Sequence, residues 1–125
     1  MHELSLAAAV VEAAEAVALE HGAASVESVR LRVGELAGVV PDALRFSFEL
    51  VADGTVLSGA ELLIDEVRAV ARCGGCESEF TVGSPPLMQC PTCARAAVEL
   101  LTGRELELAD VQLSQSRVCA ALREA

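Results

Sequence analysis

The sequence predicts an α+β fold in which two helices cover a small sheet and a four-cysteine module is inserted between two strands of that sheet. Apolar residues recur at helical spacing in two early segments and alternate along later ones, and two Cys-x-x-Cys pairs lie thirteen residues apart. The chain has 125 residues and is 53% hydrophobic, with no tryptophan or tyrosine. We therefore expect one core of alanine, valine and leucine, plus a small module held by metal.

The first helix is predicted from Leu4 to Glu20, because apolar side chains recur there at helical spacing. The apolar stripe is expected to contain Leu4, Ala8, Val11, Ala14 or Glu15, Ala18 and Leu19. His21-Gly22 should end the helix, since glycine accepts the left-handed backbone conformation found at helix C-termini. His21 is expected to be a helix-end residue without a metal role.

A strand is predicted from Val26 to Val33, where polar and apolar residues alternate. Residues 34–40 form a loop, and Pro41 is well suited to the first position of a second helix, with Asp42 in its first turn. This helix should run to Ala52, before Asp53-Gly54. Its inner face is expected to carry Leu44, Phe48 and Val51.

The second half of the chain predicts mainly strands. One strand is expected from Glu61 to Ala71, leading directly into the first cysteine pair, and a short one from Glu77 to Phe80. Two more, Val98 to Leu101 and Glu105 to Leu113, are separated by Thr102-Gly103, and residues 84–86 form a loop. We expect a helix-bearing domain made of residues 1–68 and 104–125, and a cysteine-bearing domain made of residues 69–103.

The segment from Ser114 to the end reads as a tail. Val118, Ala121 and Leu122 have helical spacing, but the stretch is short for a stable helix. A disordered extension is the simpler expectation, with Cys119 an ordinary thiol far from the two cysteine pairs.

The paired cysteines predict a zinc site. Cys73 and Cys76, followed by Cys90 and Cys93, have the spacing of two knuckles that aim four sulfurs at one ion. Four thiolates leave no open position for water, so the site is expected to be structural and zinc-ribbon-like. A pair of disulfides is the alternative. The start Met-His-Glu-Leu-Ser has neither a basic segment nor a cleavage site, so we expect a reducing, cytoplasmic location that favours the metal.

The chain start offers a second kind of ligand set. The α-amine of Met1, the imidazole of His2 and the backbone amides of His2 and Glu3 lie a few bonds apart. Planar nitrogen ligation of this kind suits Ni(II) or Cu(II). The ligands must lose protons to bind, so affinity should fall in mild acid. The alternative is a solvated chain end without a ligand.

Charge and missing motifs exclude several functions. The net charge of −10 argues against nucleic-acid binding, and no apolar run is long enough to span a membrane. A zinc hydrolase needs an open site, usually with histidine or carboxylate ligands, and neither His2 nor His21 lies near the cysteines. There is no phosphate-binding loop of the G-x-x-x-x-G-K-[ST] type. We therefore expect a binding protein and not an enzyme.

Three motifs together resemble the HypA/HybF family of nickel metallochaperones for [NiFe]-hydrogenase maturation. They are MHELSL at residues 1–6, VGELAGVVPDALRF at residues 33–46, and the two cysteine pairs. The resemblance runs to about Leu113, so residues 114–125 extend beyond it. It implies a nickel domain of two helices on a small sheet, with a zinc domain set into it.

The resemblance also implies roles for residues and partners. His2 would anchor nickel, with Glu3 and Asp42 at or beside the nickel site, while Cys73, Cys76, Cys90 and Cys93 would hold zinc. The expected partners are the accessory GTPase of hydrogenase maturation and the hydrogenase large-subunit precursor. The alternative is a zinc-ribbon module that binds protein or nucleic acid without nickel transfer.

Overall fold

The predicted α+β class is confirmed. The computed structural model describes residues 2–83, 88–94, 98–114 and 117–123, the last of these as backbone alone. In chain order its elements are α1 (Glu3–Glu20), β1 (Val26–Gly34), α2 (Pro41–Ala52), β2 (Glu61–Val67), β3 (Val70–Cys73), β4 (Glu79–Thr81), β5 (Val98–Thr102), β6 (Leu106–Leu113) and β7 (Arg117–Arg123). Neither described helix is long and apolar enough to cross a membrane.

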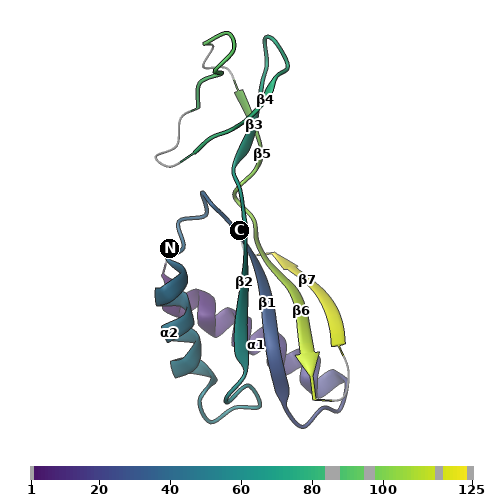
Figure 1. Ribbon diagram of the computed structural model, residues 1–125. Helices are drawn as coiled ribbons and strands as arrows, with labels where there is room; N and C mark the ends of the chain where they lie inside the picture. The colour runs from purple at the N-terminus through teal and green to yellow at the C-terminus, as the bar shows by residue number, and fades with distance from the viewer. Residues whose placement is uncertain (1, 84–87, 95–97, 115–116, 124–125) are drawn as a thin grey trace.

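The strands form two separate sheets. Sheet A has the order β2-β1-β6-β7 and sheet B the order β4-β3-β5. Both helices pack on sheet A, and sheet B stands away from them at the far end of an elongated molecule (Figure 1). We call sheet A with α1 and α2 the body, and sheet B with its four cysteines the Cys module.

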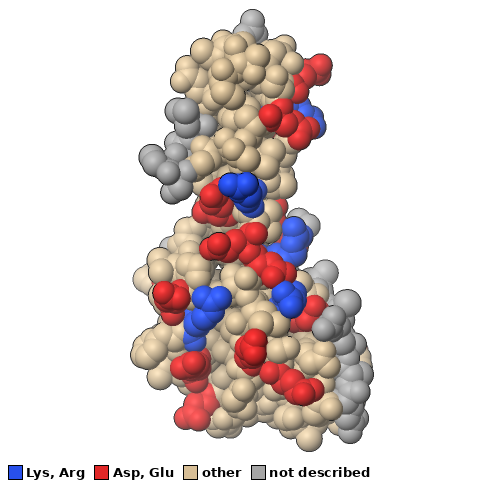
Figure 2. Space-filling model, in the orientation of Figure 1, with Lys and Arg blue, Asp and Glu red and all other residues tan. Residues whose placement is uncertain are grey.

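In the body, β1 is parallel to β2 and antiparallel to β6. Because α2 connects two parallel neighbours, it crosses over the sheet and brings its apolar side onto the same face as α1. The opposite face carries charges: Arg30 pairs with Asp65 at 2.7 Å and with Asp110 at 3.7 Å, and Arg32 pairs with Glu107 at 3.3 Å. Arginine and acidic side chains are interspersed on the strand side of the body in Figure 2. One face of sheet A therefore holds the core and the other faces water.

Helix α1 begins at Glu3, one residue before its predicted start, and ends at the predicted Glu20, but its predicted apolar stripe is partly wrong. Leu4 and Leu19 are 56% and 84% exposed, and Ala8 is also exposed. The buried side consists of Leu6, Ala7, Val10, Val11, Ala14 and Ala18. Alanine and valine occupy nearly every side of this helix, so the sequence period alone does not fix which side faces the sheet.

The predictions for β1 and α2 hold more closely. Val29, Leu31 and Val33 alternate into the core, and Val26 is also buried because an irregularity in the pairing with β6 lies between Val26 and Ser28. On α2, Leu44 and Phe48 are buried as predicted. The third buried residue is Ala52, and the predicted Val51 is only partly buried beside it.

The predicted strand from Glu61 to Ala71 is wrong, because β2 and β3 belong to different sheets. The chain leaves sheet A after Val67 and enters sheet B at Val70. At this break Gly103 lies directly on Ala69: a Cβ on Gly103 would be 2.7 Å from the Ala69 Cα and Cβ. A Cβ on Gly34 would be 2.2 Å from the carbonyl of Gly103. Two glycines therefore allow three chain segments to cross within backbone contact distance.

We call this crossing the neck; it comprises residues 34–36, 67–69 and 102–105. Hydrogen bonds connect all three segments. The Glu35 N–H donates to the Val67 carbonyl at 2.8 Å, and the Leu36 N–H donates to the Gly103 carbonyl at 2.6 Å. The Glu35 carboxylate accepts from the Ala69 N–H at 2.8 Å. The loop after β1 thus holds both connections between the body and the Cys module.

The Cys module has a very small apolar core. Its fully buried apolar members apart from cysteine are Ala69, Ala71 and Val82. Its strand β4 begins at Glu79 and not at the predicted Glu77, which has a positive φ of 60° and forms the preceding turn. β5 and β6 occur close to their predicted positions. The loop predicted at residues 84–86 lies outside the described residues.

The predicted disordered or helical tail is wrong. Residues 117–123 form β7, which pairs antiparallel with β6 and places Val118 opposite Val111. The open edge of β6 offers backbone partners, which outweigh a weak helical period in a short segment. The backbone of Cys119 lies opposite Asp110. The Cys119 side chain is not among the described side chains.

Candidate metal sites

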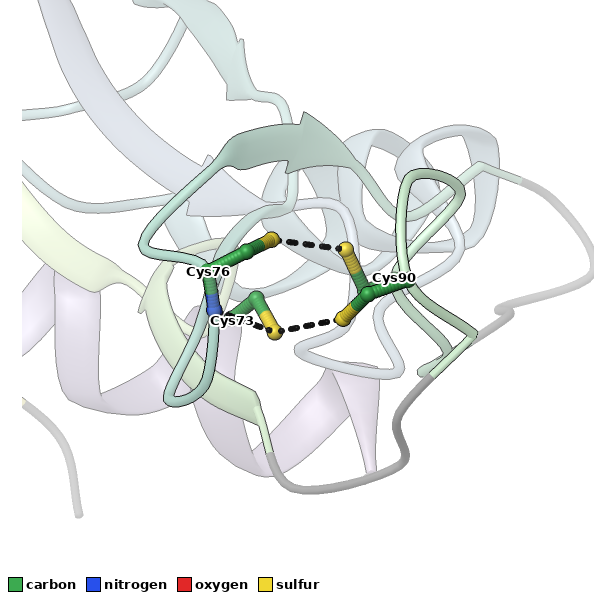
Figure 3. Close-up of side chains that lie close together, drawn as sticks. Cys73, Cys76 and Cys90 are labelled. Carbon is green, nitrogen blue, oxygen red and sulfur yellow. Dashed lines mark hydrogen bonds between the residues drawn. The ribbon is translucent and has the colours of Figure 1, made fainter.

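The four paired cysteines converge at the end of the Cys module. Cys73 ends β3, Cys76 follows in the next turn, and Cys90 and Cys93 lie in a second turn. Their four Sγ atoms lie within 4.8 Å of one another. The Sγ atoms of Cys73 and Cys93 are 3.4 Å apart. Those of Cys76 and Cys90 are 3.5 Å apart (Figure 3). The predicted grouping of these four residues is therefore present.

These distances separate a metal site from a disulfide pair. A disulfide requires an S–S distance of about 2.05 Å. Four sulfurs at about 2.3 Å from one tetrahedral zinc lie about 3.8 Å apart. The observed spacings are too long for the first arrangement and close to the second, so the donor set fits an ion bound between the two turns. The charge and softness of four thiolates match zinc in particular.

The two cysteine turns have the same local geometry. The Glu77 N–H donates to the Cys73 carbonyl at 3.0 Å, and the Ala94 N–H donates to the Cys90 carbonyl at 2.8 Å. Glu77 and Ala94, each directly after the second cysteine of a pair, have φ values of 60° and 62°. The left-handed positions therefore fall one residue beyond each pair and not within it.

Backbone and side-chain donors around the sulfurs favour the thiolate form. The N–H groups of Cys76 and Gly75 point at the Cys73 sulfur and lower the pKa of that thiol. The Ser78 side chain, 3.3 Å from the Cys76 sulfur, the Ser78 backbone and the Cys90 side chain together lower the pKa of the Cys76 thiol to about 6. Metal ligands must be deprotonated, so these contacts prepare the site for a cation.

The cysteines differ in burial. Cys73 and Cys90 are buried, whereas Cys76 and Cys93 are exposed. The buried pair supports the module from inside, and the exposed pair closes the site on the solvent side. With four sulfurs converging, no coordination position remains for a reacting water.

At the other candidate site, His2 is the N-cap of α1 and is exposed. Its backbone is extended, with φ −88° and ψ 110°, and its side chain does not cap the helix. The His2 carbonyl accepts the Leu6 N–H at 3.1 Å. The N–H groups of the first helical residues have no partner within a helix, so the amide of Glu3 is not held by the helix ladder. Met1 lies outside the described residues.

Glu3 connects the starts of the two helices. Its carboxylate accepts the N–H of Val40, the N-cap of α2, at 3.2 Å. This bond, followed by one from its own backbone N–H, lowers the pKa of Glu3. The side chain is therefore engaged in holding loop 34–40 against the N-terminus.

Asp42 lies in the first turn of α2, and its side chain is 99% exposed. Its described ionic contact is with Arg45 at 3.6 Å. The structure brings Glu3 to the residue before α2, but Asp42 points into solvent. Among the described side chains, His2, Glu3 and Asp42 do not gather as the cysteines do. His21, as expected, ends α1, with Nδ1 2.9 Å from the Val17 carbonyl.

Two neck carboxylates were missed from the sequence. Glu35 binds the Ala69 N–H, and Glu105 binds the Gly103 N–H at 2.7 Å. Glu35 lies one residue and Glu105 two residues from a glycine of the crossing. This proximity to glycine is the sequence signal that could have predicted their role. They fix the backbone between the two candidate metal sites and do not contribute to either ligand set.

Comparison with known proteins gives a consistent result. Residues 1–113 match the family model for HypA, described as hydrogenase/urease nickel incorporation, metallochaperone. A hydrogenase maturation factor HypA from Streptomyces avermitilis is 51% identical over 125 residues, covering 99% of this chain and 95% of the relative. One from Chloroflexus aurantiacus is 51% identical over 108 residues, covering 86% of this chain and 95% of the relative.

The fold is similar to a solved structure as well. The solution structure of the nickel metallochaperone HypA from Helicobacter pylori superposes with a TM-score of 0.63 at 23% identity, covering 90% of this chain and 97% of that one. At that identity the superposition supports the fold alone.

Proposed function

Since this chain belongs to the HypA family of hydrogenase-maturation nickel metallochaperones, we propose that it binds Ni(II) through its own N-terminus and delivers the ion for [NiFe]-hydrogenase assembly. The observation that carries the proposal is the extended, uncapped His2 at the start of α1. The first residues of α1, which follow His2, carry backbone N–H groups that have no partner within the helix.

Nickel is the cargo, and the proposed ligands are nitrogens. The Met1 amine, the His2 imidazole and the amides of His2 and Glu3 supply the planar arrangement that Ni(II) favours. A site at a solvated chain end also allows release, because few contacts enclose the ion. Acid weakens it, since protons compete for the amine and the imidazole.

We assign the Glu3 and Asp42 side chains secondary roles in this proposal. The Glu3 carboxylate already binds Val40, which favours a positioning role for the side chain and leaves its amide as the ligand. The Asp42 side chain is 99% exposed and contacts Arg45 only at 3.6 Å, so it is available as a transient oxygen ligand near the start of α2.

In the same proposal Cys73, Cys76, Cys90 and Cys93 hold one structural Zn(II). The four convergent sulfurs and the N–H groups directed at Cys73 support this assignment. When bound, zinc would connect the two cysteine turns and would take no part in a reaction. We further propose the domain division 1–68 with 104–125 against 69–103, with the neck as the boundary.

For partners, we propose the accessory GTPase of hydrogenase maturation and the hydrogenase large-subunit precursor, as implied by the family. Four reduced thiols at one metal site are consistent with a cytoplasmic location. The chain itself is proposed to act by binding and transfer and not as an enzyme.

The test is a comparison of tags. A tag fused before Met1 converts the amine to an amide but leaves His2 in place. We expect calorimetric titration with Ni(II) to show most of the affinity lost, as in His2→Ala, with zinc content unchanged. Protein tagged after Ala125 should bind nickel like the untagged chain. Equal nickel affinity for both tagged forms would reject the amine-anchored geometry, and undiminished binding by His2→Ala would reject the N-terminal site altogether.

A further inference from the structure

Strand β2 forms an edge of sheet A, beside α2 (Figure 1). The Val67 carbonyl accepts the Glu35 N–H, so the backbone of Val67 points toward β1. In a parallel pair this orientation alternates along the strand, so the N–H and C=O groups of Leu62, Ile64 and Glu66 point away from β1. No hydrogen bond in the described part of the chain reaches them on that side. The edge therefore carries three donors and three acceptors without a partner among the described residues; Glu66 is exposed, Ile64 half-buried and Leu62 buried.

Three hollows follow the same edge. The first, about 430 Å³, is bordered by Leu62, Ile64 and, from α2, Arg45 and Glu49. The second, about 240 Å³, shares Arg45 and Ile64 with the first and adds Glu66. The third, about 230 Å³, shares Glu66 with the second and reaches the neck. Because neighbouring hollows share wall residues, they lie next to one another along β2, and we call the three together the edge trough.

The edge trough has an excess of carboxylates after its ion pairs are counted. Arg45 pairs with Asp42, and Arg30 pairs with Asp65. Glu49, Glu61 and Glu66 take part in none of the ion pairs or side-chain hydrogen bonds of the described residues. Arg68, which borders the third hollow, likewise has no ion-pair partner among the described residues, so the three carboxylates exceed it by two charges. This negative excess around a row of free backbone groups favours an occupant with lysine or arginine side chains.

A second copy of this chain does not fit these charges. Pairing two β2 edges would bring two acidic rims together, which like-charge repulsion disfavours. A small ligand does not use a row of alternating donors and acceptors. An extended polypeptide does, since its own backbone has the complementary groups at the same spacing.

We propose that β2 is a docking edge for an extended, basic segment of a partner protein, which joins sheet A as an additional strand and lies in the edge trough against α2. The backbone bonds supply the register. The partner's lysine or arginine side chains reach Glu61 on one face of the sheet and Glu49 and Glu66 on the other. The docking edge includes neither His2 nor the N-terminal nitrogens proposed to bind nickel.

The test uses a capped heptapeptide of alternating lysine and valine, the length of β2, with the zinc-loaded full chain. In the free protein, amide exchange should be slow at Leu63 and Asp65 and fast at Ile64 and Glu66. Peptide binding should slow the second set. Binding without this change would mean surface attraction only and would overturn the proposal, as would no binding.

N-methylated peptides separate backbone pairing from charge. Methylating the amides of one alternate set should abolish binding, whereas methylating the other set should leave it nearly intact, because only one set faces β2. Equal loss for both would reject strand addition. This comparison uses wild-type protein and does not depend on any variant folding.

Protein variants refine the assignment. Glu66→Gln removes one charge and should weaken peptide binding about two- to fivefold. Glu66→Pro also removes an outward N–H, which an edge strand tolerates, and should weaken it further. Glu12→Gln, an exposed residue of α1, is the matched control. Equal affinities for Glu66→Gln and Glu66→Pro would argue against the backbone bond.

Discussion

Among the described residues, the body buries nineteen apolar side chains in one cluster, whereas the apolar cluster of the Cys module contains three. The cluster of the body includes large side chains such as Phe48 and Leu31, whereas that of the Cys module consists mostly of alanines, Ala69 and Ala71. Three buried side chains, with partly buried ones such as Phe80 and Leu100 against them, offer little to offset the conformational entropy of ordering a three-stranded sheet. The body can thus fold by burial, while the module requires the cross-link at its four sulfurs.

Removing the metal should have the largest effect: the Cys module should unfold while the body stays folded. We expect chelation of zinc from reduced protein to unfold the Cys module, because a metal bound only in the folded state contributes its binding free energy to folding. Amide NMR should lose dispersed signals from Ala71 and Val82 but keep those of Val29 and Leu44. Since both helices lie in the body, far-UV circular dichroism should change little.

A cysteine variant controls for effects of the chelator. Cys90→Ala should release zinc and reproduce the same pattern, whereas full zinc retention by this variant would contradict the four-sulfur site. Loss of the helices on zinc removal would show that the body also depends on the metal, which would contradict the difference between the two regions.

Phe48→Ala should have the next largest effect and damage only the body. This side chain is 1% exposed, and its truncation should lower the free energy of unfolding by about 3–5 kcal/mol. Urea unfolding followed by far-UV circular dichroism gives the value. Phe46→Ala, on the same helix but 64% exposed, should change stability by about 0.5 kcal/mol or less. Zinc content should stay at one per chain in both, and zinc loss in Phe48→Ala would count against independent regions.

Gly34→Ala tests the neck, where the two regions meet. The added methyl group would lie 2.2 Å from the Gly103 carbonyl, so the crossing must open, at a cost of about 1–3 kcal/mol. Amide shifts should move at Ala69 and Gly103, on the module side. Gly38→Ala meets no atom within 4 Å, but its φ of 77° makes alanine strained, so a smaller and local change is expected. Identical shift patterns in the two variants would contradict a special role for the crossing.

The smallest effect concerns Glu3. The Val40 N–H and its own N–H lower the pKa of this carboxyl below its usual value. A lowered folded-state pKa means that the bond stabilises the folded chain above the ordinary glutamate pKa and is lost as pH falls through the folded value. The Val40 amide signal should therefore titrate below about pH 4.3 in wild-type protein. In Glu3→Gln this titration should vanish, and its persistence would assign the shift to another group.

The sequence predicted what depends on local pattern or on fixed spacing. The bounds of α1 and α2 follow from helix start and stop signals at Pro41, Gly22 and Gly54. The convergence of four sulfurs follows from the two Cys-x-x-Cys pairs, because a knuckle has few possible geometries. Both signals are contained within a few neighbouring residues.

What could not be predicted depends on contacts between distant segments. The break at Ala69 arises because Gly103 packs on it, thirty-four positions later in the chain. Residues 117–123 form a strand because β6 has an open edge, not because of their own pattern. Likewise, the Glu3 side chain was expected at the nickel site, but its bond to Val40 depends on how α1 and α2 approach each other.

The insertion of the Cys module between β2 and β6 has a kinetic consequence. β1 must pair with both strands, and in the apo chain residues 68–105 form a long loop whose closure is entropically unfavourable. In a module ordered by a metal at its four sulfurs, β3 and β5 run side by side, with Val70 opposite Thr102, and the ends of that loop are already close. The logarithmic dependence of loop closure on length predicts a barrier lower by roughly 1–2 kcal/mol. The metal should therefore accelerate refolding of the body, where it makes no contact, by about tenfold.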